Sequence, residues 1–267
     1  MRCRLHQEIC DFYDFVRPRE FEDVIRDELL KRLRYTISKG YEYCDVRCFG
    51  SFAAGLYLPN ADMDLVVVSE GFMDGGRRLI CQNRTQIRRF ANFLRHEQVP
   101  EPGSVDMIFA AKVPLIKFVD RITGLKVDLS FENDTGIIAN RTFSSWKAQF
   151  PAMPIIVNIV KQFLMMRGLN DVATGGLGGF SVTCLVTSLL QNMPEVQRGT
   201  LIPEHHLGLI LMEFLNLYGN EFNTTTTGIR MTPPYYFDKV CHPTHNSRLE
   251  KLTCYSDKFK AKAAPIR

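Results

Sequence analysis

The chain has 267 residues, of which 45% are hydrophobic and 23% are charged, and its formal net charge is +4. This composition excludes a disordered, collagen-like or highly charged chain and predicts one large or two modest domains, while the mild basic excess permits a polyanionic partner. The eight cysteines are too scattered for a disulfide scaffold, which favours reduced thiols in an intracellular protein. No apolar run is long enough to span a bilayer and the first residues have no signal-peptide core, so no membrane association is expected.

The first 131 residues are predicted to form two helices followed by a mixed unit of helices and strands. The two helices are expected at residues 5–16 and 19–39, because apolar positions recur there at intervals of three and four and Pro18 separates them. Beyond residue 40, alternating apolar residues and β-branched runs indicate strands. The predicted elements are strands at 43–49, 63–69, 105–110, 113–119 and 125–131, a short helical segment after Gly50, a helix over 77–98 and a hairpin turn at 120–124.

Strand signals largely cease after Asp134, and the rest of the chain has helical periodicity. The predicted helices cover residues 135–149, 152–168, 180–192 and 204–218. We therefore expect an α+β fold. Its predicted parts are a mixed domain over 1–147 that includes the N-terminal helices, a helical domain over 148–232, and an irregular basic tail over 233–267.

Two aspartates open a Val-rich predicted strand. Asp62 and Asp64 project from the same face, because strand side chains alternate. Carboxylates this close repel each other unless a cation lies between them, and oxygen-rich sites of this kind suit Mg²⁺. A third carboxylate, Asp128, lies on another predicted strand, and pairing of the two strands would bring it beside the first two. Three such carboxylates can hold two metal ions, one to activate an attacking hydroxyl and one to hold a triphosphate and its leaving oxygen.

A Gly-Ser pair precedes these aspartates. Gly50 and Ser51 stand ten residues before Asp62, at the start of the predicted helical segment, where main-chain N–H groups and the Ser51 hydroxyl can cradle a phosphate. An Asp-x-Asp pair alone is common and usually marks surface acids in a turn. Here the pair follows Gly-Ser at a set spacing and opens a buried apolar strand, where unpaired carboxylates are costly. The combination favours a functional site.

The pattern of Gly-Ser, ten residues and Asp-Met-Asp-Leu, with a later Val-Asp-Leu-Ser, resembles the nucleotidyltransferase superfamily of DNA polymerase β type. A closer resemblance, to the Trf-type noncanonical poly(A) RNA polymerases, is carried by LHQEICDFYDFVRPRE, FGSFAAGLYLPNADMDLVVV, KVDLSFENDTG, IVKQFLMMRGLN and TGGLGGFSVTCLVTSLLQ. This resemblance implies a palm-like nucleotidyltransferase domain over residues 1–147. It also implies a helical PAP-associated central domain over 148–232 that is incomplete at its C-terminal end.

The resemblance assigns roles to individual residues of this chain. The residues that match the metal-binding catalytic carboxylates are Asp62, Asp64 and Asp128. Those that match nucleotide-binding positions are Gly50, Ser51, Gly136, Lys161, Gly179 and Phe180. Among them, the resemblance implies that Lys161 meets the phosphates and that the ring of Phe180 stacks on the base.

The activity implied by the resemblance is template-independent adenylyl transfer. AMP from ATP would be added to RNA 3′ ends with two Mg²⁺ or Mn²⁺ ions. Such enzymes mark nuclear RNAs for exosomal decay, which implies a location in the nucleus, the nucleolus included. The implied partners are RNA 3′ ends, a zinc-knuckle RNA-binding subunit and an exosome-associated helicase, with no membrane.

Two alternatives remain open at this stage. Relatives continue past the equivalent of Tyr235-Tyr236-Phe237 into a loop that reads the adenine edge, and this sequence has no such loop. A terminal uridylyltransferase is therefore one alternative, and a catalytically weak scaffold with a nucleotidyltransferase fold is the other. The complete set of three aspartates argues against the scaffold. An active chain is expected to incorporate ATP with reduced preference over the other nucleotides.

Overall fold

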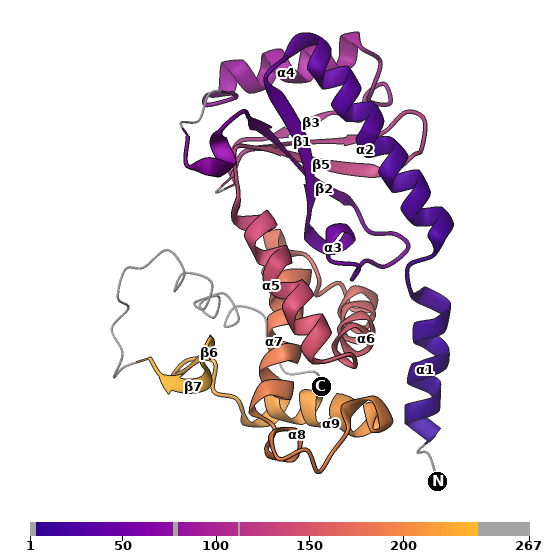
Figure 1. The fold of residues 1–267 in the computed structure, drawn as a ribbon, viewed down its shortest axis with the longest axis vertical. Coiled ribbons are helices and arrows are strands. Elements are labelled where there is room, and N and C mark those ends of the chain that lie inside the picture. The colour runs from indigo at the N-terminus through magenta and orange to yellow at the C-terminus, as the bar shows by residue number, and fades with distance from the viewer. Residues whose placement is uncertain (1–3, 77–79, 112, 240–267) are drawn as a thin grey trace. The chain divides into compact units, whose positions relative to one another are not determined.

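The computed structural model describes residues 4–76, 80–111 and 113–239 (Figure 1). The chain forms two compact units. One holds residues 17–144 and is here called the sheet unit; the other, the helical unit, joins the segment ending at Val16 to the chain from Ser145 onward. The mixture of helices and strands confirms the predicted α+β class. Within the described residues, no helix combines the length and the apolarity that crossing a membrane requires.

A five-stranded sheet with the order β1-β2-β5-β4-β3 forms the centre of the sheet unit. Its strands are β1 (Cys44–Phe49), β2 (Met63–Ser69), β3 (Asp106–Ile108), β4 (Leu115–Val119) and β5 (Lys126–Phe131). The helices of this unit are α2 (Glu20–Gly40), α3 (Gly50–Ala53), the single turn η1 (Phe72–Asp74) and α4 (Arg84–His96). Strands β2 and β5 are parallel, and the other neighbouring pairs are antiparallel. Helix α5 (Thr135–Gln149) includes the boundary between the two units.

The core of the sheet unit lies against one face of the sheet. Helices α2 and α4 contribute Leu29, Leu33, Ile37, Phe90 and Leu94 to it. Leu65 of β2 and Leu129 of β5 are fully buried in the same cluster. Because side chains alternate along a strand, Asp64 and Asp128 point to the opposite face. The sheet therefore separates the core from the carboxylates.

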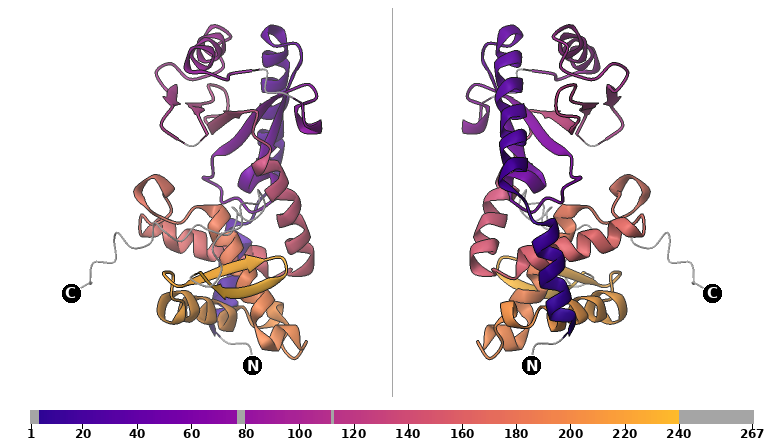
Figure 2. Two further views of the ribbon diagram at one scale, coloured as in Figure 1. Left: turned by 90° about the vertical axis from the view of Figure 1, so that its left-hand side faces the viewer. Right: turned by 90° about the vertical axis from the view of Figure 1, so that its right-hand side faces the viewer.

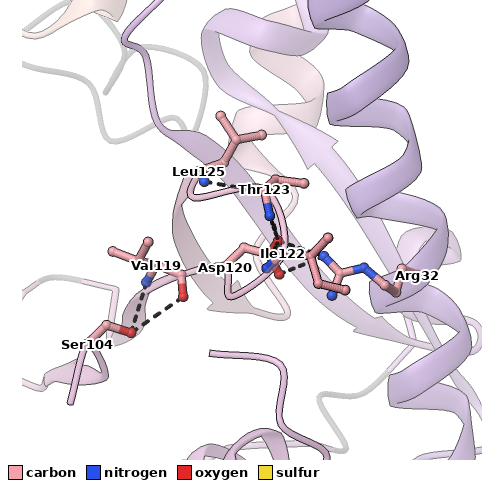
Figure 3. A network of polar contacts seen from close by, with 7 residues as sticks. All are labelled: Arg32, Ser104, Val119, Asp120, Ile122, Thr123 and Leu125. Atoms are coloured by element: carbon pink, nitrogen blue, oxygen red, sulfur yellow. Dashed lines mark hydrogen bonds and ion pairs between the residues drawn. The ribbon is translucent and has the colours of Figure 1, made fainter. Parts of the chain in front are cut away.

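A buried carboxylate holds the turn between β4 and β5 (Figure 3). Asp120, which is 1% exposed, accepts hydrogen bonds from the N–H and the hydroxyl of Thr123 at 2.8 and 2.7 Å. Nη2 of Arg32, on α2, lies 2.7 Å from both Asp120 oxygens. The predicted hairpin turn is therefore confirmed. A fixed turn sets the register of the strands that it joins, and in this register Lys117 lies opposite Asp128.

The helical unit is built from helices and a two-stranded ribbon. Its elements are α1 (Arg4–Val16), α6 (Met153–Met166), η2 (Val172–Thr174), α7 (Gly179–Asn192), α8 (Pro194–Gln197), η3 (Pro203–His205), α9 (Leu207–Asn216), η4 (Leu217–Glu221), β6 (Thr227–Met231) and β7 (Pro234–Asp238). Helix α1 packs against α6 and α9, and the buried His6 accepts at Nδ1 a hydrogen bond of 3.2 Å from the Leu207 N–H. The ribbon of β6 and β7 contacts α7 (Figure 2).

The structure differs from the predicted division of the chain in two places. The sequence placed α1 with the sheet, but α1 belongs to the helical unit because it packs against α6 and α9. The predicted irregular tail over 233–267 is wrong at its start, where Pro234–Asp238 forms β7. There the aromatic run Tyr235-Tyr236-Phe237 pairs with β6, as expected of residues with high strand propensity. Residues 240–267 lie outside the described residues.

Two predicted helices also have different bounds. The helix expected over 77–98 begins only at Arg84, because the side chain of Asn83 accepts a hydrogen bond from the Gln86 N–H and caps the helix there. Residues 77–79 lie outside the described part of the chain. The helix expected over 204–218 is divided into η3, α9 and η4, and the non-helical angles of His206, φ −133° and ψ 35°, separate η3 from α9.

Candidate active site

The parallel pairing of β2 and β5 places two of the predicted carboxylates directly opposite each other. Asp64 and Asp128 are partners in register, so their side chains emerge on the same face of neighbouring strands. Both are half-buried, whereas the residues that follow them, Leu65 and Leu129, are fully buried on the other face. The sheet thus brings together two acidic groups that are 64 positions apart in the sequence.

A lysine completes this row across the sheet. Lys117 pairs with Asp128 from the other side, and its Nζ lies 2.6 Å from Asp128 Oδ2. Burial raises the pKa of the Asp128 carboxyl, the Lys117 ammonium opposes this effect, and the charge of Asp62 adds to the increase. Partial burial would lower the pKa of Lys117, but the hydrogen bond and charge of Asp128, with the charges of Asp62 and Asp64, raise it. The four groups therefore form one electrostatic cluster.

Asp62 is the last loop residue before β2, and it is half-buried. In the described part of the chain, no group of three or more His, Cys, Asp or Glu side chains is already arranged to hold a metal ion. Lys117 supplies a positive charge to the aspartates instead. The donor set nevertheless fits a hard divalent cation, because it consists of carboxylate oxygens, the ligands that Mg²⁺ and Mn²⁺ prefer.

Gly50 is required by its direct contact with Asp64. A Cβ built on Gly50 would lie 2.0 Å from Asp64 Oδ2, and its φ of +71° belongs to the left-handed region. The next residue, Ser51, is half-buried in α3, and its carbonyl accepts a hydrogen bond of 2.8 Å from the Leu56 N–H. The Gly-Ser pair is therefore built against the carboxylate cluster.

Gly136 has a packing explanation. A Cβ on Gly136 would lie 2.3 Å from Cδ2 of Phe49, which pairs with Asp64 across β1 and β2. The absence of a side chain at this position lets the Phe49 ring pack against the start of α5. The predicted contact of Gly136 with a nucleotide stays a prediction.

The remaining predicted contacts lie in the helical unit. Lys161 of α6 and Gly179 at the start of α7 are neighbours, since a Cβ on Gly179 would lie 3.3 Å from Lys161 Cε. Phe180 follows in α7 and is half-buried. The predicted nucleotide contacts therefore divide equally, with Gly50, Ser51 and Gly136 in the sheet unit and Lys161, Gly179 and Phe180 in the helical unit.

The sequence analysis missed Lys117. A signal for it was present, because Lys117 interrupts the apolar strand that precedes the predicted turn at 120–124. Counting outward from that turn pairs residue 117 with residue 128, as the structure does. Only the register reveals that this lysine faces the aspartate.

Two family models match the chain. The model described as "Poly(A) RNA polymerase, mitochondrial-like, central palm domain" matches residues 5–148. The model described as "Cid1 family poly A polymerase" matches residues 206–261, across the predicted boundary at 233. With the paired aspartates on a palm-type sheet, these matches define the chain as having a nucleotidyltransferase fold with a palm domain and a PAP-associated domain.

Individual proteins agree with this class. Poly(A) RNA polymerase protein 2 of Saccharomyces cerevisiae is 36% identical over 87% of this chain and 38% of its own length. The solved polymerase core of TRAMP, an RNA surveillance complex, is 35% identical and covers 90% of this chain and 72% of its own, with a TM-score of 0.78. The Cid1 poly(U) polymerase structure (19% identity, TM-score 0.68, 89% of this chain and 79% of its own) shares the fold.

The chain belongs to the poly(A) RNA polymerase family, in the branch that includes the Trf-type enzymes. It spans about a third of the length of the curated relatives that it matches.

Proposed function

We propose that this chain is the polymerase core of a polynucleotide adenylyltransferase, which adds AMP from ATP to the 3′ ends of RNA without a template. The observation that carries the proposal is the placement of Asp64 and Asp128 in register on parallel strands, against the backbone of Gly50. Membership of the poly(A) RNA polymerase family supports the choice of reaction.

Asp62, Asp64 and Asp128 would hold two divalent cations, Mg²⁺ or Mn²⁺, through their carboxylate oxygens. When bound there, such cations lower the pKa of the RNA 3′ hydroxyl and stabilise the charge that develops on the departing pyrophosphate. Lys117 neutralises part of the negative charge of the cluster and opposes the increase in the pKa of Asp128 that burial causes. Its charge thereby favours the ionised carboxylate, the form that binds a cation.

Nucleotide contacts are proposed residue by residue, as the resemblance implies them. Gly50 and Ser51 would offer main-chain N–H groups and a hydroxyl to the phosphates, and Lys161 would add a positive charge. The ring of Phe180 would stack on the base, for which any base offers a suitable face. Gly136 would line the nucleotide, and Gly179 would lie near the phosphates.

We also propose the setting in which this activity operates. The solved polymerase core with 35% identity belongs to TRAMP, an RNA surveillance complex. By analogy this chain would act on RNA in the nucleus, with a zinc-knuckle RNA-binding subunit and an exosome-associated helicase as partners. Because the net charge is only +4, the isolated chain is expected to bind RNA weakly and in a strongly salt-dependent manner.

The test is extension of a labelled oligo(A) RNA with ATP, GTP, CTP and UTP in separate reactions. The wild-type chain is compared with Asp62→Ala/Asp64→Ala and with Glu42→Ala/Glu101→Ala, which removes two exposed carboxylates from the same unit. We expect AMP addition by the wild type and the control, and nearly none by the aspartate variant. Preferential UMP addition would instead identify a uridylyltransferase. Failure of the wild type to extend RNA with any nucleotide would identify a scaffold.

A further inference from the structure

Arg26, on α2, is one of the largest fully buried side chains of the protein, with 2% exposure. Its hydrogen bonds go to main-chain carbonyls rather than to a carboxylate. Nη2 donates to the carbonyl of Ala61 at 3.0 Å and to that of Pro59 at 3.4 Å. Ala61 directly precedes Asp62, so the guanidinium of Arg26 binds the backbone immediately before a predicted metal ligand.

The same guanidinium contacts the other end of this loop. Its Cζ lies 4.6 Å from the ring centroid of Tyr57 and 5.7 Å from that of Phe52, the residue after Ser51. The Tyr57 hydroxyl donates a 2.7 Å hydrogen bond to Oδ1 of Asp23. Asp23 and Arg26 are three positions apart on α2 and therefore share one face of the helix. That face binds the loop at its beginning, middle and end.

Main-chain hydrogen bonds form turns near the two ends of this loop. The Gly55 N–H donates to the Phe52 carbonyl, the Leu56 N–H to the Ser51 carbonyl and the Ala61 N–H to the Leu58 carbonyl, each at 2.8 Å. To these turns, Arg26 and Asp23 of α2 add hydrogen bonds to Pro59, Ala61 and the Tyr57 hydroxyl. Arg26 and its aromatic neighbours therefore link the part of the loop next to Ser51 to the part next to Asp62.

Burial of this arginine is energetically unfavourable in isolation. A buried guanidinium loses its hydration, and its Nη1 is buried with no hydrogen-bond partner among the described residues. An apolar side chain of similar size would fill the same space without that penalty. Retention of a charged group here is explained if its directional hydrogen bonds to the loop are needed.

We propose that Arg26 is a positioning residue, which holds the loop from Phe52 to Ala61 so that Ser51 and Asp62 are placed to bind phosphate and a divalent cation. The proposal rests on the proposed function, because it takes Asp62 as a metal ligand. Arg26 itself touches neither group. It acts on the metal site through the backbone of the loop, as residues that orient metal ligands do in other proteins.

The test is binding of Mn²⁺ alone, measured by electron paramagnetic resonance on the full chain without RNA or nucleotide, together with the melting temperature. The variants are Arg26→Met and Arg26→Lys. Arg34→Met is the matched control, because Arg34 also lies on α2 and donates to a main-chain carbonyl, that of Val46, at 2.7 Å. We expect Arg26→Met to weaken Mn²⁺ binding by about 10- to 100-fold, Arg26→Lys to restore part of the loss, and Arg34→Met to leave binding unchanged.

A lower melting temperature with unchanged Mn²⁺ binding in Arg26→Met would show a merely structural role and would overturn the proposal. If Arg26→Met does not fold, the test uses Arg26→Lys. Weaker Mn²⁺ binding by a folded Arg26→Lys variant supports the proposal, and Mn²⁺ binding equal to that of the wild type overturns it. Asp62→Asn separates this proposal from the proposed function. Retained Mn²⁺ binding in Asp62→Asn would overturn the metal site, and the role of Arg26 with it. If Asp62→Asn loses Mn²⁺ binding while Arg26→Met binds Mn²⁺ like the wild type, only the role of Arg26 is overturned.

Discussion

The ammonium of Lys117 lies 2.6 Å from Oδ2 of Asp128, on the neighbouring strand and directly opposite in register. Asp64 faces Asp128 from the other side. Asp128 is therefore flanked by a cation and by a second carboxylate, while it is partly withdrawn from water. The charge of the lysine opposes the increase in the pKa of Asp128 that burial and the charge of Asp62 cause.

Replacement of Lys117 by Met is expected to raise the pKa of Asp128 further. The positive charge of Lys117 opposes the increase that burial and Asp62 cause, so its removal favours the protonated carboxyl. The measurement is a ¹³C NMR titration of the carboxyl groups in metal-free protein. Lys126→Met is the control, because Lys126 is exposed on the same strand and is not among the groups that shift Asp128. A midpoint for Asp128 that stays the same or falls in Lys117→Met would contradict the prediction.

Gly50→Ala is expected to destabilise the protein and to remove RNA extension. The left-handed φ of +71° alone costs about 1–3 kcal/mol for a residue with a Cβ, and the new methyl group would displace the Asp64 carboxylate. Gly124→Ala separates the two effects, since Gly124 has a φ of +69° but open space around its Cβ position. We expect the backbone strain to lower the free energy of unfolding of both variants, as measured by denaturation. Loss of RNA extension is expected only in Gly50→Ala. Equal extension by the two variants would show that the contact with Asp64 is unimportant.

Gly136→Ala is expected to destabilise the sheet unit through a clash with the Phe49 ring. Overpacking of this kind costs about 1–3 kcal/mol. Phe49→Leu should relieve the clash, so the double variant is expected to lose less stability than the sum of the two single variants. The free energies come from urea denaturation, with Gly219→Ala as a control because its Cβ position is open. Strict additivity of Gly136→Ala and Phe49→Leu would rule out a contact between these residues.

Phe180→Ala is expected to weaken binding of all four nucleotides by similar factors. The stacking that the proposed function assigns to Phe180 is worth about 1–3 kcal/mol and does not distinguish one base from another. The measurement is the apparent affinity for ATP, GTP, CTP and UTP in RNA extension. Phe163→Ala provides the control, because Phe163 lies on α6 beneath Arg167, at 4.3 Å, and has no assigned nucleotide contact. A loss confined to ATP would mean that Phe180 reads the adenine rather than only stacking on it.

The sequence by itself determined the features that depend on neighbouring residues. Alternation along a strand predicted that Asp64 and Leu65 point to opposite faces of β2, and apolar periodicity located most helices. The turn at 120–124 followed from the local pattern, and Asp120 holds it as expected of an Asp at a turn. The Gly-Ser pair before the aspartates was also visible in the sequence, because its chemistry depends on residue type and spacing.

Only the tertiary structure decided which distant segments meet. The parallel pairing that sets Asp128 beside Asp64 joins strands separated by two other strands and a helix, and no local pattern specifies that neighbour. The apolar face of α1 shows that the helix must be buried, but it does not show against which unit. The burial of Arg26 was likewise not visible in the sequence, because an arginine within a helix usually faces water. In the structure, a loop about 35 positions later in the chain covers it. These contacts were hidden because burial and pairing depend on the surfaces that the folded chain brings together, whereas sequence patterns report only the preference of each segment for a conformation.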